Sequence, residues 1–123
     1  RQAAKSSPNF GDRKTYQMNF KNSEEAINEV KLDINEGADV IIIKPAISYL
    51  DIIYRIKQRF NVPIIAYNVS GEYSMVKSAA ENNFIGGIET ILEILHSIKR
   101  SGANAIISYH ALEVAKYLKV NDL

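Results

Sequence analysis

The sequence predicts an α/β fold in which three parallel strands are flanked by helices. Amphipathic segments with an apolar period of about 3.6 residues alternate with short, continuous apolar runs along the chain. Such alternation is typical of a parallel sheet whose strands are joined by right-handed helical crossovers. We expect the strands at residues 40–43, 64–69 and 105–109.

The first helix and the first strand show the signals most clearly. Asn22, followed three residues later by Glu25, is typical of a helix start, and Gly37 provides the stop. The run at residues 40–43 is β-branched throughout. A continuous run of this kind predicts a strand that is buried on both faces of a parallel sheet.

The remaining elements follow from similar signals. Asn61 and Pro63 end the second helix, Ser70 and Gly71 are expected to form a turn, and a polar loop covers residues 81–87. After the first helix, the expected helices cover residues 49–60, 73–80, 88–100 and 112–118.

One junction between a helix and a strand occurs twice in the sequence. Residues 36–44 align without gaps on residues 101–109. In each copy a helix ends at a glycine, a short polar turn follows, and an apolar strand places one polar side chain at its carboxyl end. These side chains are Lys44 and Tyr109, which we therefore expect at corresponding positions of the sheet.

Composition limits the classes of partner. Fifteen Lys and Arg residues against fourteen Asp and Glu give a net charge of +1, so we expect neither nucleic acid nor a membrane as partner. Without cysteine the sequence offers no disulfide and no thiolate metal ligand, which permits a reducing compartment, and we expect the cytoplasm. Because Arg1 is not a natural start, we expect the chain to be a fragment.

Lys44 is the first candidate for chemistry. It ends an apolar strand, where desolvation would favour the neutral amine that attacks a carbonyl substrate. On position alone, a lysine at a strand end more often reaches out to solvent or pairs with a carboxylate. His96 and His110 lack the spacing of metal ligands.

Hydroxyl groups follow the same pattern at the other strand ends. Tyr67, Ser70 and Tyr109 could bind a substrate carboxylate or relay a proton, although packing or capping would explain any one of them. Their convergence with Lys44 at one edge favours a site. Ligands meet this edge both in open α/β sheets and in (β/α)8 barrels, of which three strands would be only a part.

A long polar loop precedes the first helix. Arg1, Arg13 and Gln17 accompany this loop, and a guanidinium group suits a substrate carboxylate, although most loop arginines are merely solvated. We expect residues 1–22 to form a loop, which is often functional at such a length, and residues 23–123 to form the βα units of one domain.

A series of short motifs runs through nearly the whole chain in a fixed order. They are Ala-Ala-Lys-Ser-Ser-Pro at residues 3–8, Gly-Asp-Arg-Lys-Thr-Tyr-Gln-Met at 11–18, Gly-Ala-Asp at 37–39, Lys-Pro-Ala at 44–46, Tyr-Leu-Asp-Ile at 49–52, Val-Ser-Gly-Glu-Tyr at 69–73 and Ile-Lys-Arg-Ser-Gly-Ala at 98–103. Their order and spacing closely resemble the C-terminal portion of porphobilinogen synthase, also called 5-aminolaevulinate dehydratase.

The resemblance implies a TIM barrel that condenses two molecules of 5-aminolaevulinic acid to porphobilinogen, with loss of water, in tetrapyrrole and haem biosynthesis. Each substrate is held by its own lysine as a Schiff base. Lys44 matches the lysine of the substrate that supplies the propionate side, and Ser70 and Tyr109 match residues that bind its carboxylate.

The resemblance also identifies the loop at residues 1–22 as an active-site lid and bears on metals. Arg1, Arg13 and Gln17 match residues that serve the second substrate, whose lysine lies upstream together with the residues that decide zinc dependence. Zinc use is therefore undetermined. Glu29 matches a glutamate that, in many bacterial and plant members, takes part in an allosteric magnesium site between subunits, although a solvated helix carboxylate is equally consistent.

Assembly and location follow from the same family. Its members are typically homo-octamers that use an N-terminal arm, so we expect incomplete assembly and no activity from these residues alone. A plastid location would apply in a plastid-bearing source. The family usually begins its long helix with acidic residues where this chain has Gly86 and Gly87, which is expected to weaken capping.

Two alternatives remain open. A class I aldolase also uses a strand-end lysine in a barrel, although residues 13–18 and 69–73 follow the synthase pattern. The other alternative is a piece without catalytic activity, because half a barrel with one of two lysines should not condense two substrates.

Overall fold

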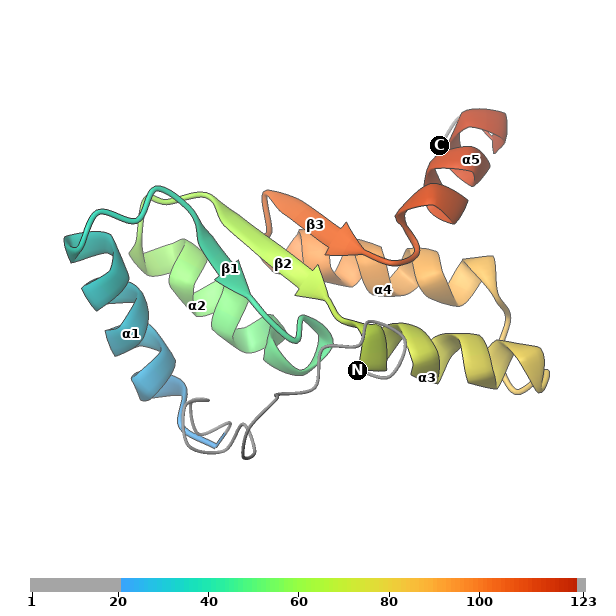
Figure 1. Cartoon of the computed structure of the whole chain (residues 1–123), viewed down its shortest axis with the longest axis horizontal. Helices are drawn as coiled ribbons and strands as arrows, with labels where there is room; N and C mark the ends of the chain where they lie inside the picture. The colour runs from blue at the N-terminus through green and yellow to red at the C-terminus, as the bar shows by residue number, and fades with distance from the viewer. Residues whose placement is uncertain (1–20, 122–123) are drawn as a thin grey trace, which may run out of the picture.

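The computed structural model describes residues 21–121 and contains three parallel strands in the order β1-β2-β3 (Figure 1). The strands are β1 (Ile41–Ile43), β2 (Ile64–Asn68) and β3 (Ala105–Ser108). The helices are α1 (Ser23–Asn35), α2 (Leu50–Arg59), α3 (Ser70–Glu81), α4 (Ile88–Ser101) and α5 (Ala111–Asn121), with one 3-10 turn, η1 (Ile47–Tyr49). The predicted α/β class is confirmed, with the sequential strand order of consecutive βα units in a barrel.

Backbone pairing places the carboxyl ends of the three strands at one edge. Ile43 of β1 pairs with Ala66 of β2, and Asn68 at the end of β2 pairs with Ser108 at the end of β3. The segments that follow the three strands therefore all start at this carboxyl edge of the sheet.

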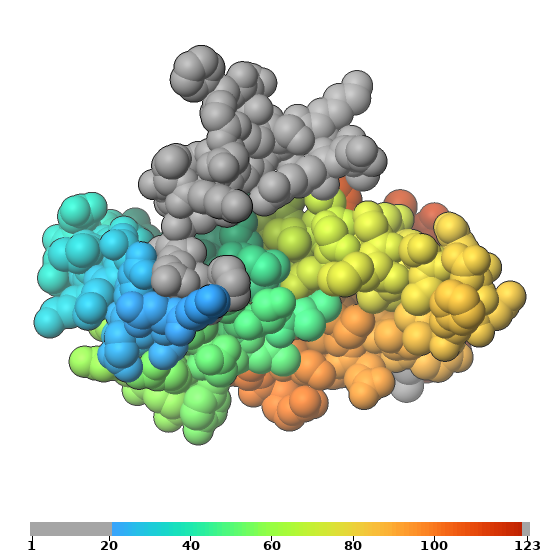
Figure 2. All heavy atoms as spheres, turned by 90° about the horizontal axis from the view of Figure 1, so that it is seen from below, coloured from blue at the N-terminus to red at the C-terminus, as the bar shows by residue number. Residues whose placement is uncertain are grey.

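Helices cover one face of this sheet. In Figure 1, α2 and α4 run behind the strands, and Figure 2 shows the same helical layer from below, with α1 beside α2. The core between helices and sheet is aliphatic, and Ile53, Ile56, Ile64, Ala66 and Ile98 have no exposed surface. None of the helices within residues 21–121 is long and apolar enough to cross a membrane.

The opposite face of the sheet is open. Ile42 is 55% exposed, and Val40 and Ile107 are also exposed. The expectation that residues 40–43 form a strand buried on both faces is therefore wrong for the described residues. The reason is that α1, α2 and α4 all pack on the face that carries Ile41 and Ile43.

Most helix ends follow the predicted signals. The Asn22 side chain accepts hydrogen bonds from the backbone N–H groups of Glu24 and Glu25, which confirms the helix start. The expected turn at Ser70 and Gly71 is wrong, because α3 begins directly at Ser70. The Glu72 carboxylate accepts the Val69 N–H at 3.2 Å and so caps the first turn of the helix.

The repeated junction has the same backbone form in both copies. Gly37 and Gly102 have positive φ angles of 102° and 127° and end the helices before β1 and β3. After the second glycine, the Asn104 N–H donates to the Ile64 carbonyl at 2.8 Å, and the Asn104 side-chain oxygen accepts the Ile64 N–H at 3.0 Å. Asn104 thus fixes the pairing of β3 with β2 before the strand begins.

Replacing Gly102 by alanine is expected to destabilise the fold by about 1–3 kcal/mol, because the left-handed backbone disfavours any side chain. The new Cβ would also lie 2.9 Å from the Lys57 stem. Urea unfolding measures the loss. Gly71→Ala is the matched control, since nothing lies within 4 Å of its Cβ position and its backbone is helical. Equal losses for the two variants would contradict the prediction.

Candidate active site

The candidate residues of the described part lie at the carboxyl edge of the sheet. Lys44 directly follows β1, Tyr67 lies in β2, Ser70 is the first residue of α3, and Tyr109 directly follows β3. The three parallel strands point the same way (Figure 1), so these four positions lie at the same edge of the sheet.

Tyr67 and Tyr109 are in contact across the open face. The neighbours of Tyr67 in β2, Ala66 and Asn68, are buried towards the helices, so the Tyr67 side chain takes the other face. Hydrogen bonding to the Tyr67 side chain raises the pKa of the Tyr109 phenol. The Tyr73 ring of α3 lies 5.7 Å from the Tyr109 ring, centroid to centroid. The Tyr109 ring therefore lies beside two other tyrosines, Tyr67 and Tyr73, at the strand edge.

Lys44 is exposed, which differs from the expected desolvation. The strand residue before it, Ile43, is buried against the helices, whereas Lys44 lies beyond the helical layer. Among residues 21–121 the helices that could shield a side chain from water are on the other face. Desolvation of this amine thus requires cover over the open face.

Ser70 is buried at the start of α3. As the first residue of α3 it lies at the amino end of the helix, where backbone N–H groups and the helix dipole favour an anion. A substrate carboxylate is one such anion.

A buried carboxylate joins the segments that follow β1 and β2. Glu72 is only 4% exposed, and one of its oxygens accepts the backbone N–H of Ile47 at 2.6 Å. The other oxygen accepts the Asn68 amide at 2.8 Å and the Val69 N–H. All three partners are neutral N–H donors, which offset the cost of burying the charge.

The network continues from β2 to β3. The Asn68 side-chain oxygen accepts the Ser108 hydroxyl at 2.7 Å, and the Ser108 oxygen accepts the His110 N–H at 3.1 Å. Hydrogen bonds therefore connect η1, the end of β2 and the turn after β3. We call Glu72, Asn68 and Ser108 the strand-end network.

No role for the strand-end network could be predicted from the motifs of the sequence. A usable signal was present, because Glu72 stands at the third position of a helix that starts at a strand end, where an acidic side chain caps the backbone. The pairing of Asn68 with Ser108 depends on the register of distant strands, which the sequence does not display.

His110 is a second buried polar group that the sequence analysis left without a role. It is 1% exposed, its ring lies 4.7 Å from the Tyr73 ring, and its Nδ1 atom has no hydrogen-bond partner. Burial lowers the pKa of His110, and the positive charge of Lys77 lowers it further, against the opposite effect of Glu113. Lys77 and Glu113 are themselves paired at 2.7 Å.

Other predicted residues lie away from this edge or outside the described part. Arg1, Arg13 and Gln17, together with most of the expected lid, fall outside residues 21–121. Glu29 is exposed on α1, and residues 21–121 contain no cluster of three potential His, Cys, Asp or Glu ligands. A hydrated Mg²⁺ binds one or two carboxylates, so Glu29 fits as one ligand of a site completed elsewhere.

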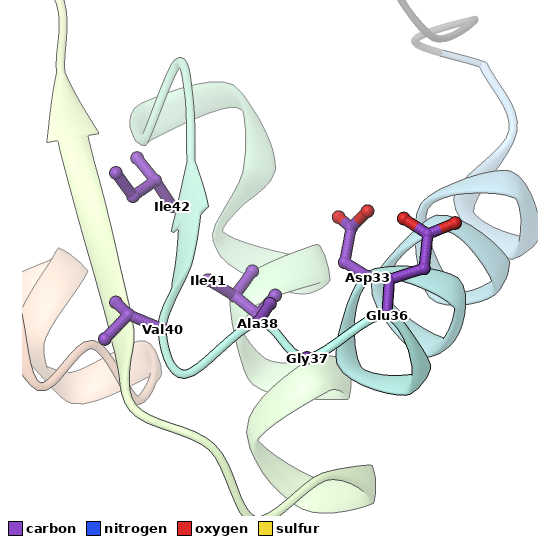
Figure 3. A pocket seen from close by; sticks show the side chains of 7 residues that line it. All are labelled: Asp33, Glu36, Gly37, Ala38, Val40, Ile41 and Ile42. Atoms are coloured by element: carbon purple, nitrogen blue, oxygen red, sulfur yellow. The ribbon is translucent and has the colours of Figure 1, made fainter.

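Two hollows on the surface of residues 21–121 lie away from Lys44 and Tyr109. One of about 390 Å³ lies at the amino end of β1, where the carboxylates of Asp33 and Glu36 project from the end of α1 (Figure 3). Another of about 270 Å³ lies between α4, α5 and β3 and is mostly apolar. Neither hollow is lined by Lys44, Tyr67, Ser70 or Tyr109.

Comparison with known families shows which family the chain belongs to. A family model described as "Delta-aminolevulinic acid dehydratase" matches residues 1–117. The chain belongs to the delta-aminolevulinic acid dehydratase family. This match includes the four strand-edge residues and, beyond the described part, Arg1, Arg13 and Gln17.

Individual members of the delta-aminolevulinic acid dehydratase family are closely similar to this chain in sequence. The enzymes of that name from Synechocystis sp. and Bacillus subtilis are 58% and 57% identical over 97% and 96% of this chain. The chain spans about a third of the length of these relatives, 36% in each case.

A solved structure of the delta-aminolevulinic acid dehydratase family has the same fold over this region. The enzyme from Toxoplasma gondii, named porphobilinogen synthase and solved with the reaction product porphobilinogen, superposes with a TM-score of 0.87 at 46% identity. The superposition covers 92% of this chain and 32% of the Toxoplasma chain. The described strands and helices therefore belong to a larger barrel in that relative.

The environment of His110 predicts a pH-dependent stability. Because its pKa is lower in the folded than in the unfolded state, the unfolded state binds more protons as the pH falls. The stabilising contribution of neutral His110 should be fully present above the ordinary histidine pKa. The free energy of unfolding should then decline from pH 7 towards pH 5, by at most about 1.4 kcal/mol per pH unit. Urea unfolding at several pH values should show a flatter profile for His110→Phe.

The control for this experiment is His96→Gln, on the exposed side of α4. It should keep the wild-type profile. An unchanged slope in His110→Phe would show that other groups cause the pH dependence.

Proposed function

We propose that the complete protein is a lyase that condenses two molecules of 5-aminolaevulinic acid to porphobilinogen, with loss of water, in tetrapyrrole biosynthesis. The observation that carries the proposal is the family match over residues 1–117, which includes the strand-edge residues. The names of the relatives and the product bound in the Toxoplasma enzyme give the reaction class.

Lys44 is the proposed nucleophile for one substrate. Its neutral amine attacks the ketone of 5-aminolaevulinate, forms a carbon–nitrogen bond and expels the ketone oxygen as water, which leaves an imine. Lys44 is exposed within the described residues. In the complete barrel, cover over the open face would withdraw the amine from water and favour its neutral form.

Hydroxyl donors are proposed to hold the carboxylate of the same substrate. Ser70 lies at the amino end of α3, where a negative charge is favoured. The Tyr109 phenol is protonated at neutral pH, as an ordinary phenol is, and can donate a hydrogen bond to a carboxylate. Tyr67 supports Tyr109 through the hydrogen bond between them.

The second substrate would be bound by residues outside the described part. Arg1, Arg13 and Gln17 are proposed to bind it from the lid, with a second lysine supplied by another part of the complete protein. A class I aldolase would also use a strand-end lysine, but the family model accounts for the lid motif and the strand edge together.

Substituting Lys44 and Ser70 in the full-length enzyme should produce defects of different kinds. Lys44→Ala should abolish turnover, because no neighbouring group replaces a covalent anchor. Ser70→Ala should chiefly raise KM, by roughly 10–100-fold, because it removes a hydrogen bond to a charged carboxylate worth about 1.5–3 kcal/mol. Steady-state kinetics measure both effects.

Borohydride trapping provides the chemical test. With 5-aminolaevulinate present, borohydride should reduce the imine and leave a stable adduct on Lys44, which mass spectrometry of the peptides locates. The nucleophilic role is refuted if Lys44 stays unmodified while other lysines are trapped.

We also propose an allosteric magnesium site to which Glu29 contributes, in a homo-octamer. The exposed position of Glu29 on α1 leaves it available to a neighbouring subunit. Glu29→Gln should raise the magnesium concentration that stabilises the octamer, because a neutral amide replaces one of the few carboxylates that hold a hydrated Mg²⁺. Light scattering of the full-length protein across a magnesium titration measures this change.

Glu36→Gln is the matched control, because Glu36 is an exposed acid at the end of the same helix. It should leave the titration unchanged. Equal magnesium dependence for wild type and Glu29→Gln would remove Glu29 from the site.

A further inference from the structure

The strand-end network spans the two sides of the candidate active site. Its first side is η1, where Glu72 accepts the N–H of Ile47, three residues after Lys44. Its far side is the turn after β3, where Ser108 accepts the N–H of His110, the residue next to Tyr109. The network thus accepts backbone N–H groups close to Lys44 and Tyr109, but it includes neither of these two side chains.

We propose that Glu72 is a positioning residue that sets the distance between Lys44 and the carboxylate-binding residues Ser70 and Tyr109. The inference rests on the proposed function, since it concerns the geometry of imine formation at Lys44. It goes further in giving a role to a residue that would touch neither substrate.

The chemistry of the three contacts requires a carboxylate at position 72. Both oxygens of Glu72 accept hydrogen bonds, and every partner is an N–H donor: Ile47, Asn68 and Val69. A glutamine at this position would turn one acceptor into an NH₂ group that faces a donor. A buried donor facing another donor is left without a partner, so one contact would open.

The two halves of the network should have separable effects. Glu72 holds the β1 side directly and reaches the β3 side only through Asn68 and Ser108. Loss of Glu72 should therefore misplace Lys44, whereas loss of the Ser108 hydroxyl should chiefly loosen Tyr109. A small displacement of a reacting group lowers the reaction rate steeply, because attack depends on alignment.

The test uses the full-length enzyme with Glu72→Gln and, as matched control, Glu81→Gln at the exposed end of the same helix. Glu72→Gln should slow borohydride trapping of Lys44 at saturating 5-aminolaevulinate, and lower kcat, by roughly 10–100-fold. Glu81→Gln should match wild type. Ser108→Ala should instead raise KM several-fold, and the rate of borohydride trapping of Lys44 at saturating 5-aminolaevulinate should stay nearly unchanged. A purely structural role would change thermal stability without this division between kcat and KM.

Wild-type trapping rates in Glu72→Gln would overturn the proposal. If Glu72→Gln does not fold, the proposal is tested with Ser108→Ala. An unchanged KM in Ser108→Ala would equally overturn the proposal. Hydrogen exchange at the Ile47 amide provides a readout independent of activity, and it should accelerate in Glu72→Gln alone. Failure of the wild-type enzyme to trap at Lys44 would refute the proposed function, whereas unchanged Ile47 exchange in Glu72→Gln would refute the positioning role.

Discussion

In-register pairing of three parallel strands, with helices on one face only, is the constraint on which the candidate site depends. Alternation along each strand sends Ile41 and Ile43 into the helical layer and leaves Ile42 on the opposite face. The same alternation in β2 buries Ala66 and turns Tyr67 to the open side. A shift of one residue in register would reverse these directions and separate Tyr67 from Tyr109.

Polar groups at the strand ends satisfy two requirements at once. Hydrogen bonds must replace water at a carboxylate as buried as Glu72, and neighbouring backbone N–H groups are the nearest donors. Meeting that requirement also fastens η1 to the end of β2. Asn68 then extends the connection to β3, so the polar groups that would be costly if unpaired instead hold the edge of the sheet together.

The fold could be predicted from the sequence wherever the determinant was local. Asn22 and the glycines at positions 37 and 102 act within a few residues of themselves, and each ends or begins its helix as expected. The start of α3 at Ser70 was missed because it depends on the Glu72 cap. The exposure of Ile42 and Lys44 was missed because β-branched composition indicates a strand but not which of its faces is covered. The contact of Tyr67 with Tyr109 required the register of β2 and β3.

The open face has a consequence for how such a chain behaves before it is covered. β1 and β3 are the outer strands of the sheet, so each presents one row of backbone groups that no strand among residues 21–121 pairs. Beside these rows lie the exposed apolar side chains of Ile42 and Ile107. Unpaired edges next to an apolar surface invite association between copies. Solubility would therefore depend on how quickly other protein covers this face and pairs with these edges.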